Sequence, residues 1–195
     1  MKKYFDILSV FFVLITLLAI SGISNANPPP PPITVNIYSG HGVTGGGAPY
    51  SGLVGSLHSY DIMFATTTGF AWHPFGLNSF GADINGTINV TTDNTYNFTL
   101  ISDDGSMLYI DGSLVINNGD AHGPTSVSGN PFLTAGLHSF EVQFFEDYGG
   151  SSGLDLYLPP SGVTYYYTSA PEPAIMILLG LGLIGLAGVR RKFDN

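Results

Sequence analysis

The chain contains no cysteine, and it has no lysine or arginine between Tyr4 and Val189. Without cysteine there is neither a disulfide nor a thiolate metal site, so packing and any bound ion must stabilise the folded part. Without lysine in this long stretch, a Gly-Lys-Ser/Thr phosphate-binding loop and Schiff-base chemistry are both excluded from it. The five basic residues all lie at the two ends of the chain: Lys2, Lys3, Arg190, Arg191 and Lys192.

The stretch from Asn27 to Ala170 is anionic. It has 144 residues, a normal size for one domain with its own core. Its surface repels phosphate backbones, so we expect no nucleic-acid partner, and it attracts cations. Its acidic residues are Asp61, Asp83, Asp93, Asp103, Asp104, Asp111, Asp120, Glu141, Glu146, Asp147 and Asp155.

Both ends of the chain have the composition of membrane-directed segments. The apolar run Ile7–Ile20 follows two lysines and precedes small residues, which predicts a signal peptide with a helix at residues 1–26. A proline-rich spacer at residues 27–32 follows it. Ala174–Val189 carries no charge and, at about 1.5 Å per helical residue, would form a helix roughly 24 Å long. We expect this segment to be a transmembrane helix or to insert transiently into the membrane.

Between these ends the pattern predicts an all-β fold. The runs are short and alternating, glycine is frequent, and a two-residue hairpin turn is indicated at Asp111-Gly112. Many short strands of this kind are typical of an antiparallel β-sandwich or a jelly-roll-like barrel. The glycine-rich segment Ser39–Ser59 shows no clear pattern, and we expect a loop there. Two sets of residues are expected on single buried strand faces: Tyr96, Phe98 and Leu100, and Phe140, Val142 and Phe144.

Asp103 and Asp104 are adjacent carboxylates at the predicted end of a strand. Two such charges raise each other's pKa unless a cation lies between them, and no lysine or arginine is available nearby. Calcium is the natural candidate, because it prefers hard oxygen ligands. The alternative is a solvated turn, since aspartate followed by Gly105 also favours one. Spacing alone leaves both interpretations open.

No arrangement of residues indicates an enzyme. Gly149–Gly153 fits the Gly-x-Ser-x-Gly pattern, but the last histidine, His138, precedes it and no helix is expected after it within the domain. The five histidines include no pair with the four-residue spacing of a zinc protease. Acid pairs such as Glu141 and Glu146 occur by chance in an acid-rich domain. We therefore expect no catalytic residues.

Four stretches resemble the anthrax protective-antigen-type (PA-fourteen) β-sandwich domain, which would occupy residues 33–170. They are Gly86–Val90, Thr95–Ile116, Leu133–Val142 and Phe145–Gly150. Domains of that family are mostly carbohydrate-binding modules of glycosidases, toxins, flocculins and adhesins. The resemblance therefore implies carbohydrate binding or adhesion, with an extracellular polysaccharide or glycan as partner.

In the lectin members of that family, an aspartate pair joined by a cis peptide holds a calcium ion that coordinates sugar hydroxyls. The matching residues here are Asp103 and Asp104. A second loop completes the family's site, often with an asparagine; the corresponding loop here is Glu146–Gly153, which has none. The resemblance implies Asp147 as a third calcium ligand, with Tyr148 and Gly149 contacting the glycan. Residues that could approach instead are Asn117, Asn118 and Asp120.

Residues 171–195 resemble the Pro-Glu-Pro C-terminal (PEP-CTERM) sorting signal of Gram-negative bacteria, which an exosortase reads. The motif residues are Pro171, Glu172 and Pro173, followed by the apolar helix and by a basic cluster that includes Arg190 and Arg191. The resemblance implies export through the inner membrane by the secretion machinery, then residence at the cell surface or in the extracellular matrix. A plain membrane anchor is the alternative.

These observations together predict an exported module that binds carbohydrate through calcium. The competing interpretation is a structural matrix component in which calcium only stabilises the loops.

Overall fold

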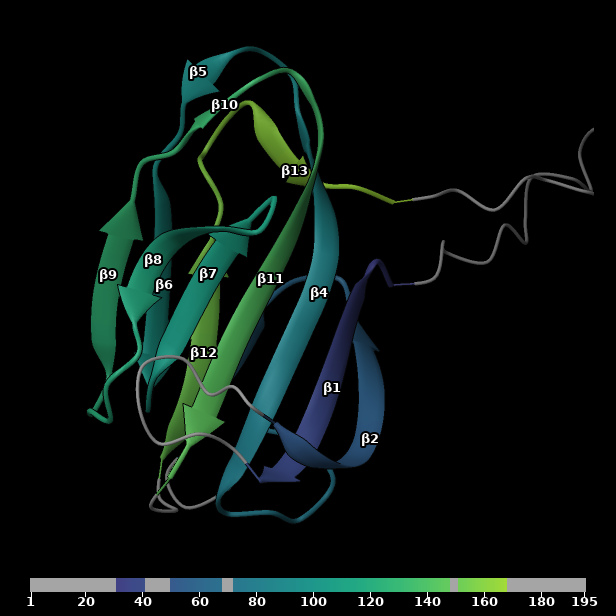
Figure 1. The fold of residues 1–195 in the computed structure, drawn as a ribbon, viewed down its shortest axis with the longest axis vertical. Helices are drawn as coiled ribbons and strands as arrows, with labels where there is room; N and C mark the ends of the chain where they lie inside the picture. The colour runs from purple at the N-terminus through teal and green to yellow at the C-terminus, as the bar shows by residue number, and fades with distance from the viewer. Residues whose placement is uncertain (1–30, 41–49, 68–71, 148–150, 168–195) are drawn as a thin grey trace, which may run out of the picture. The chain divides into compact units, whose positions relative to one another are not determined.

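The computed structural model describes residues 31–40, 50–67, 72–147 and 151–167 (Figure 1). Within these ranges the chain is all-β and forms two packed sheets, which confirms the predicted β-sandwich. No part of the described chain forms an apolar helix long enough to cross a membrane. The predicted signal helix and C-terminal hydrophobic helix lie outside the described residues.

The larger sheet has seven strands in the order β2-β1-β4-β11-β7-β8, with β13 also paired to β4. Figure 1 shows the long strands β4 and β11 side by side in the middle of this sheet. Its members are β1 (Ile33–Gly40), β2 (Ser51–Ser59), β4 (Phe80–Val90), β7 (Ser106–Ile110), β8 (Ser113–Asn118), β11 (Gly136–Glu146) and β13 (Val163–Tyr165).

The smaller sheet has four strands in the order β3-β12-β6-β9. They are β3 (Met63–Thr67), β6 (Phe98–Asp103), β9 (Thr125–Gly129) and β12 (Ser152–Tyr157). A separate short ladder joins β5 (Asn94–Thr95) to β10 (Phe132–Leu133).

Alternating residues of the two sheets form a single apolar core. Ile84 and Ile88 of β4 lie in one cluster with Leu154 of β12, and each is at most 1% exposed. Burial of these side chains supplies the main driving force for folding. All six residues predicted to share buried strand faces are buried: Tyr96, Phe98 and Leu100, and Phe140, Val142 and Phe144. Tyr96, however, lies between β5 and β6 and not within a strand.

The predicted hairpin turn at Asp111-Gly112 is confirmed. The φ angles of Asp111 and Gly112 are 49° and 74°, and Ile110 pairs with Ser113 across the turn. A positive φ at both central residues belongs to the type I′ geometry, whose twist matches that of the flanking strands.

The expectation of a loop over Ser39–Ser59 is wrong at both ends of this range, because Ser39 and Gly40 belong to β1 and Ser51–Ser59 forms β2. This strand pairs with β1 from Ser59 opposite Ile33 to Ser51 opposite Gly40. Val54 is the single β-branched residue of β2, and Gly52 has a φ of 68°. Its strand conformation therefore depends on the hydrogen bonds offered by β1, a non-local partner that local composition does not reveal.

One ion pair connects the β7–β8 turn to the start of β11. His138 Nδ1 lies 2.6 Å from Asp111 Oδ2, and His138 Nε2 lies 2.8 Å from the carbonyl oxygen of Thr134. Both neighbours are acceptors, so the hydrogen bonds that His138 donates to Asp111 and to the Thr134 carbonyl raise the pKa of His138. Partial burial acts to raise the pKa of Asp111, but hydrogen bonds from His138 and Ser139 lower it overall.

We predict that this pair stabilises the domain between about pH 4 and pH 6.5. A raised histidine pKa gives stability that is complete below its unfolded value of 6.5 and is lost as the pH rises through the folded value. A lowered aspartate pKa gives stability that is present above 3.8 and is lost as the pH falls. Because the pair is partly exposed, its contribution should not exceed about 1 kcal/mol. Melting curves of wild type and His138→Gln should differ more at pH 5.5 than at pH 9; an equal difference at both values would contradict the assignment.

Candidate functional site

Asp103 and Asp104 lie where the chain passes from one sheet to the other. Asp103 is the last residue of β6 in the smaller sheet, and β7 of the larger sheet begins at Ser106. Only Asp104 and Gly105 connect the two strands, and the peptide bond between Asp103 and Asp104 is cis, as the resemblance implies. The aspartate pair is therefore built into a short crossing at one end of the sandwich.

Gly105 is required by the close approach of two other segments. A Cβ atom on this residue would lie 2.7 Å from Cζ of Phe145 and 2.8 Å from the carbonyl oxygen of Gly119. The Gly105 carbonyl oxygen accepts a hydrogen bond of 3.0 Å from the Phe145 N–H. The crossing thus packs directly against β11 and against the segment between β8 and β9.

The carboxylate of Asp104 is held by backbone amides from two different loops. Its Oδ1 accepts a hydrogen bond of 3.1 Å from the His122 N–H, and its Oδ2 accepts one of 3.0 Å from the Asp147 N–H. The residue is 7% exposed. The β8–β9 and β11–β12 loops therefore converge on this carboxylate and set its orientation.

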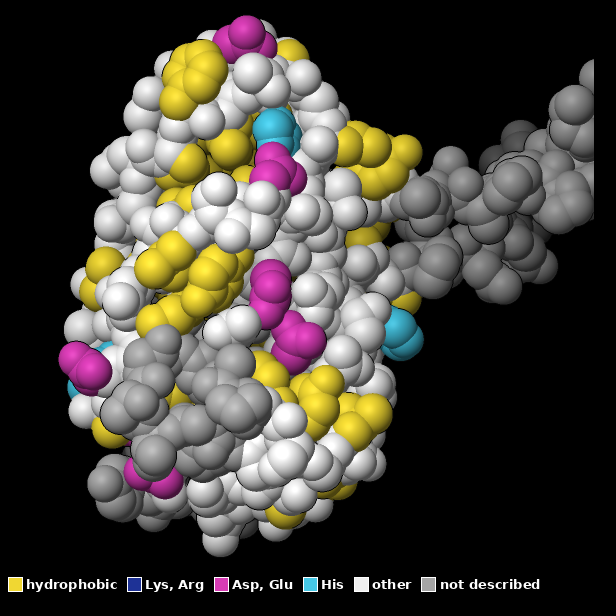
Figure 2. Space-filling view, in the orientation of Figure 1, with side chains coloured by type: hydrophobic (Ala, Val, Ile, Leu, Met, Phe, Trp, Pro, Cys, Tyr) yellow, Lys and Arg dark blue, Asp and Glu magenta, His cyan; other side chains and the backbone are white. Residues whose placement is uncertain are grey.

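Asp103 has an environment that disfavours its negative charge. Partial burial raises its pKa, the charge of Asp104 raises it further, and His122 offsets part of the effect. No lysine or arginine side chain appears among the described residues on the face in Figure 2, in keeping with their absence between Tyr4 and Val189. A cation bound between the two carboxylates would relieve this repulsion.

The predicted site residues are brought together only in part. Asp147 meets Asp104 through its backbone N–H, while Tyr148 and Gly149 lie outside the described residues, as do all predicted residues of the sorting motif. No group of three or more histidine, aspartate and glutamate side chains is arranged to hold a metal within the ranges described. Further oxygen ligands could come from backbone carbonyls, from other oxygen-bearing side chains, from solvent or from the bound partner.

His122 and Asn118 are contributors whose roles the sequence analysis did not recognise. The histidine was one of five scattered histidines, and Asn118 was only one of three residues that could approach the pair. His122 supplies the amide that binds Asp104, and its Nε2 lies 3.1 Å from the carbonyl oxygen of Asn118. No local sequence signal identifies them, because both contacts depend on the path of the β8–β9 loop.

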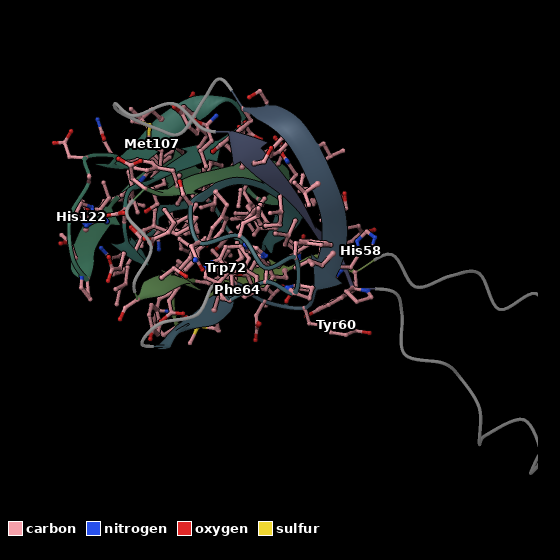
Figure 3. The ribbon with its side chains drawn as sticks, turned by 90° about the horizontal axis from the view of Figure 1, so that it is seen from below. His58, Tyr60, Phe64, Trp72, Met107 and His122 are labelled. Carbon is pink, nitrogen blue, oxygen red and sulfur yellow. The ribbon has the colours of Figure 1, made fainter. Side chains whose placement is uncertain are left out.

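Trp72 does not provide an open stacking face for a sugar ring. Its ring stacks on Phe64 with centroids 4.4 Å apart and meets Phe80 edge-on at 5.4 Å. Figure 3 shows Trp72 and Phe64 together within the fold, away from His122 at the rim. The tryptophan is thus mainly a packing residue.

The described part of the Gly-x-Ser-x-Gly segment, Ser151–Gly153, does not form a nucleophile elbow. Its serine, Ser151, leads directly into strand β12, whereas the elbow needs a turn from a strand into a helix. His138 is engaged with Asp111 and Thr134.

Two family models match adjacent stretches of the chain. The one described as the PA14 domain matches residues 53–170, and the one described as the PEP-CTERM protein-sorting motif matches residues 169–192. Both resemblances found in the sequence are confirmed by these matches. No curated protein matches the chain significantly in sequence.

Several solved structures share the fold. An anti-sigma factor domain-containing protein has a TM-score of 0.57 and 19% identity, and the alignment covers 73% of this chain and 50% of that protein. The PA14 sugar-binding domain from an RTX adhesin has a TM-score of 0.54 and 18% identity over 72% of this chain and 99% of its own. The PA14 domain of the antifreeze protein MpAFP has a TM-score of 0.55 and 15% identity over 74% of this chain and 90% of its own.

We predict that Gly105→Ala destabilises the domain by about 1–3 kcal/mol, because the new methyl group overlaps Phe145 and the Gly119 carbonyl. Gly123→Ala is the matched control, since a Cβ there has no neighbour within 4 Å. Denaturant unfolding of both variants checks this prediction. Equal stabilities would show that the crossing is not closely packed.

Proposed function

Because this chain belongs to the PA14 domain family and carries a PEP-CTERM protein-sorting motif, we propose that it is an exported module that binds carbohydrate through calcium. The observation that carries the proposal is the Asp103–Asp104 pair, whose second carboxylate is oriented by two loop amides. The chain offers no lysine or arginine side chain between Tyr4 and Val189 to neutralise the pair. An external cation is therefore the natural partner of these carboxylates.

Asp103 and Asp104 are the residues that would hold the ion. Calcium takes six to eight oxygen ligands, mixing carboxylates with carbonyls and water, so two carboxylates supply only part of its shell. The remaining positions suit backbone carbonyls, solvent and the hydroxyl groups of a ligand. The chemistry of the donor set fits calcium better than zinc, because the chain lacks cysteine and the pair presents only oxygen.

Carbohydrate is the ligand class that the family membership favours. One similar structure is the sugar-binding PA14 domain of an RTX adhesin, which aligns over nearly its entire length. A sugar would bind by replacing calcium-bound water with two of its hydroxyls, and the surrounding loops would select the sugar. The acid-only charge of the domain favours neutral or cationic glycans over polyanionic ones.

Its destination is the cell surface or the extracellular matrix. The sorting motif indicates export through the exosortase system of Gram-negative bacteria. We infer that the N-terminal signal peptide directs translocation, that the C-terminal apolar run inserts transiently in the inner membrane, and that exosortase processing follows. The ligand would then be an extracellular polysaccharide of the matrix.

The second candidate is a structural matrix component in which calcium only fixes the loops around Asp104. The observation in its favour is that both oxygens of this carboxylate are already bound to loop amides. In neither case is an enzyme proposed, since the serine of the only hydrolase-like motif leads into a strand.

We predict that calcium raises the melting temperature of the full chain and that a glycan array gives a signal that a chelator removes. Saturation at 100 times Kd should add about 2.7 kcal/mol to the unfolding free energy. Asp103→Asn with Asp104→Asn should abolish both effects, because the amides are nearly isosteric but neutral.

The matched control is Asp61→Asn with Asp93→Asn, which removes the same charge from two exposed residues that are not candidate calcium ligands. A melting-temperature rise without any glycan signal would favour the structural role. Absence of any calcium effect on the wild-type chain would refute both candidates.

A further inference from the structure

We propose that Asn118 and His122 are positioning residues that orient the Asp104 carboxylate for its cation. The inference rests on the proposed calcium site, which it deepens. Neither side chain need touch the ion; they act through the backbone of the β8–β9 loop.

Asn118 is a buried residue whose side chain connects β8 to β6 and β9. It is the last residue of β8 and is 6% exposed. Its Nδ2 donates hydrogen bonds to Ser102 Oγ of β6 at 3.0 Å and to the carbonyl oxygen of Thr125 in β9 at 3.2 Å. Ser102 Oγ lies in turn 2.7 Å from Ser106 Oγ of β7. One amide group thus joins the end of β8 directly to β6 and β9, and the Ser102 hydroxyl extends this network to Ser106 of β7.

His122 closes the loop that Asn118 begins. Its Nε2 lies 3.1 Å from the carbonyl oxygen of Asn118, and its Nδ1 lies 2.8 Å from the carbonyl oxygen of Gly123. Thr125 Oγ1 donates a further hydrogen bond of 2.8 Å to the same Gly123 oxygen. The ring therefore cross-links the two ends of the six-residue segment 118–123.

This cross-link places the His122 N–H against Asp104 Oδ1. The contacts form a continuous path from Ser106 through Ser102, Asn118 and His122 to the carboxylate. A carboxylate whose two oxygens are each fixed by one N–H can rotate little, so its remaining lone pairs keep a defined direction. Residues of this kind, which orient a ligand group without touching the metal, typically contribute 10–100-fold to metal affinity.

The experiment compares calcium affinities of full-length variants in detergent by isothermal titration calorimetry. His122→Phe keeps an aromatic ring but removes its hydrogen-bonding nitrogens, and it should weaken calcium binding about 10-fold or more. His122→Gln retains an amide donor that can reach the Asn118 carbonyl, and it should stay within about threefold of wild type. Asn118→Ala should weaken binding about as much as His122→Phe. His58→Phe, on the distant edge strand β2, is the matched control and should bind like wild type.

A merely structural role would lower the melting temperature of the calcium-free protein and leave the calcium Kd unchanged. A positioning role predicts that His122→Phe raises the calcium Kd and leaves the melting temperature of the calcium-free protein nearly unchanged, since the ring is partly exposed and contributes little to the core. Calcium affinities of His122→Phe and Asn118→Ala within twofold of wild type would overturn the proposal.

Amide hydrogen exchange separates this proposal from the calcium site itself. In the calcium-free wild type and in His122→Gln, the backbone amide of residue 122 should exchange slowly. In His122→Phe and Asn118→Ala the same amide should exchange at least about 10-fold faster. The Asp147 amide, which binds the other oxygen of Asp104, is the internal reference. If wild type binds no calcium, the proposed function fails, and the exchange rates alone decide whether these residues orient Asp104. Equal exchange rates of the residue 122 amide in all four proteins would then overturn the positioning role.

Discussion

The hydrogen bonds that two loop amides donate to Asp104 are the interactions on which this end of the sandwich depends. The carboxylate lies in a crossing of two residues between the sheets, and each oxygen accepts an N–H from a different loop. Since Gly105 packs against both β11 and the Gly119 carbonyl, the crossing, the two loops and the strand ends form one interlocked unit. The geometry of the aspartate pair therefore depends on how the strands and loops at this end of the sandwich pack together.

Charge composition gives this unit its chemical character. A carboxylate pair in most proteins can recruit a neighbouring lysine or arginine, but none exists here between Tyr4 and Val189. The positive charge available to the domain comes from histidine, as at His138, where it joins the β7–β8 turn to β11. At Asp103, burial and the charge of Asp104 raise the pKa, and His122 offsets only part of this effect. The domain therefore combines an oriented anionic site with a lack of internal cations to fill it.

Local sequence rules predicted the features that depend on local chemistry. The turn at Asp111-Gly112, the buried face of Phe140, Val142 and Phe144, and the all-β class follow from φ preferences and from the two-residue period of a strand. Strand β2 was missed, because its conformation depends on pairing with β1 rather than on its own propensity. The roles of Asn118 and His122 were missed for the same kind of reason, since their partners lie in other strands and loops.

The sequence by itself determined the all-β class, the anionic domain between basic ends, the sorting motif and the position of the aspartate pair at the end of a strand. Each of these is a matter of composition, short-range periodicity or a contiguous motif. Only the tertiary structure decided how Asp104 is oriented and which residues orient it. The amides of His122 and Asp147 are 18 and 43 residues away along the chain. Contacts of such separation form only when the two sheets pack and bring the loops of one end together.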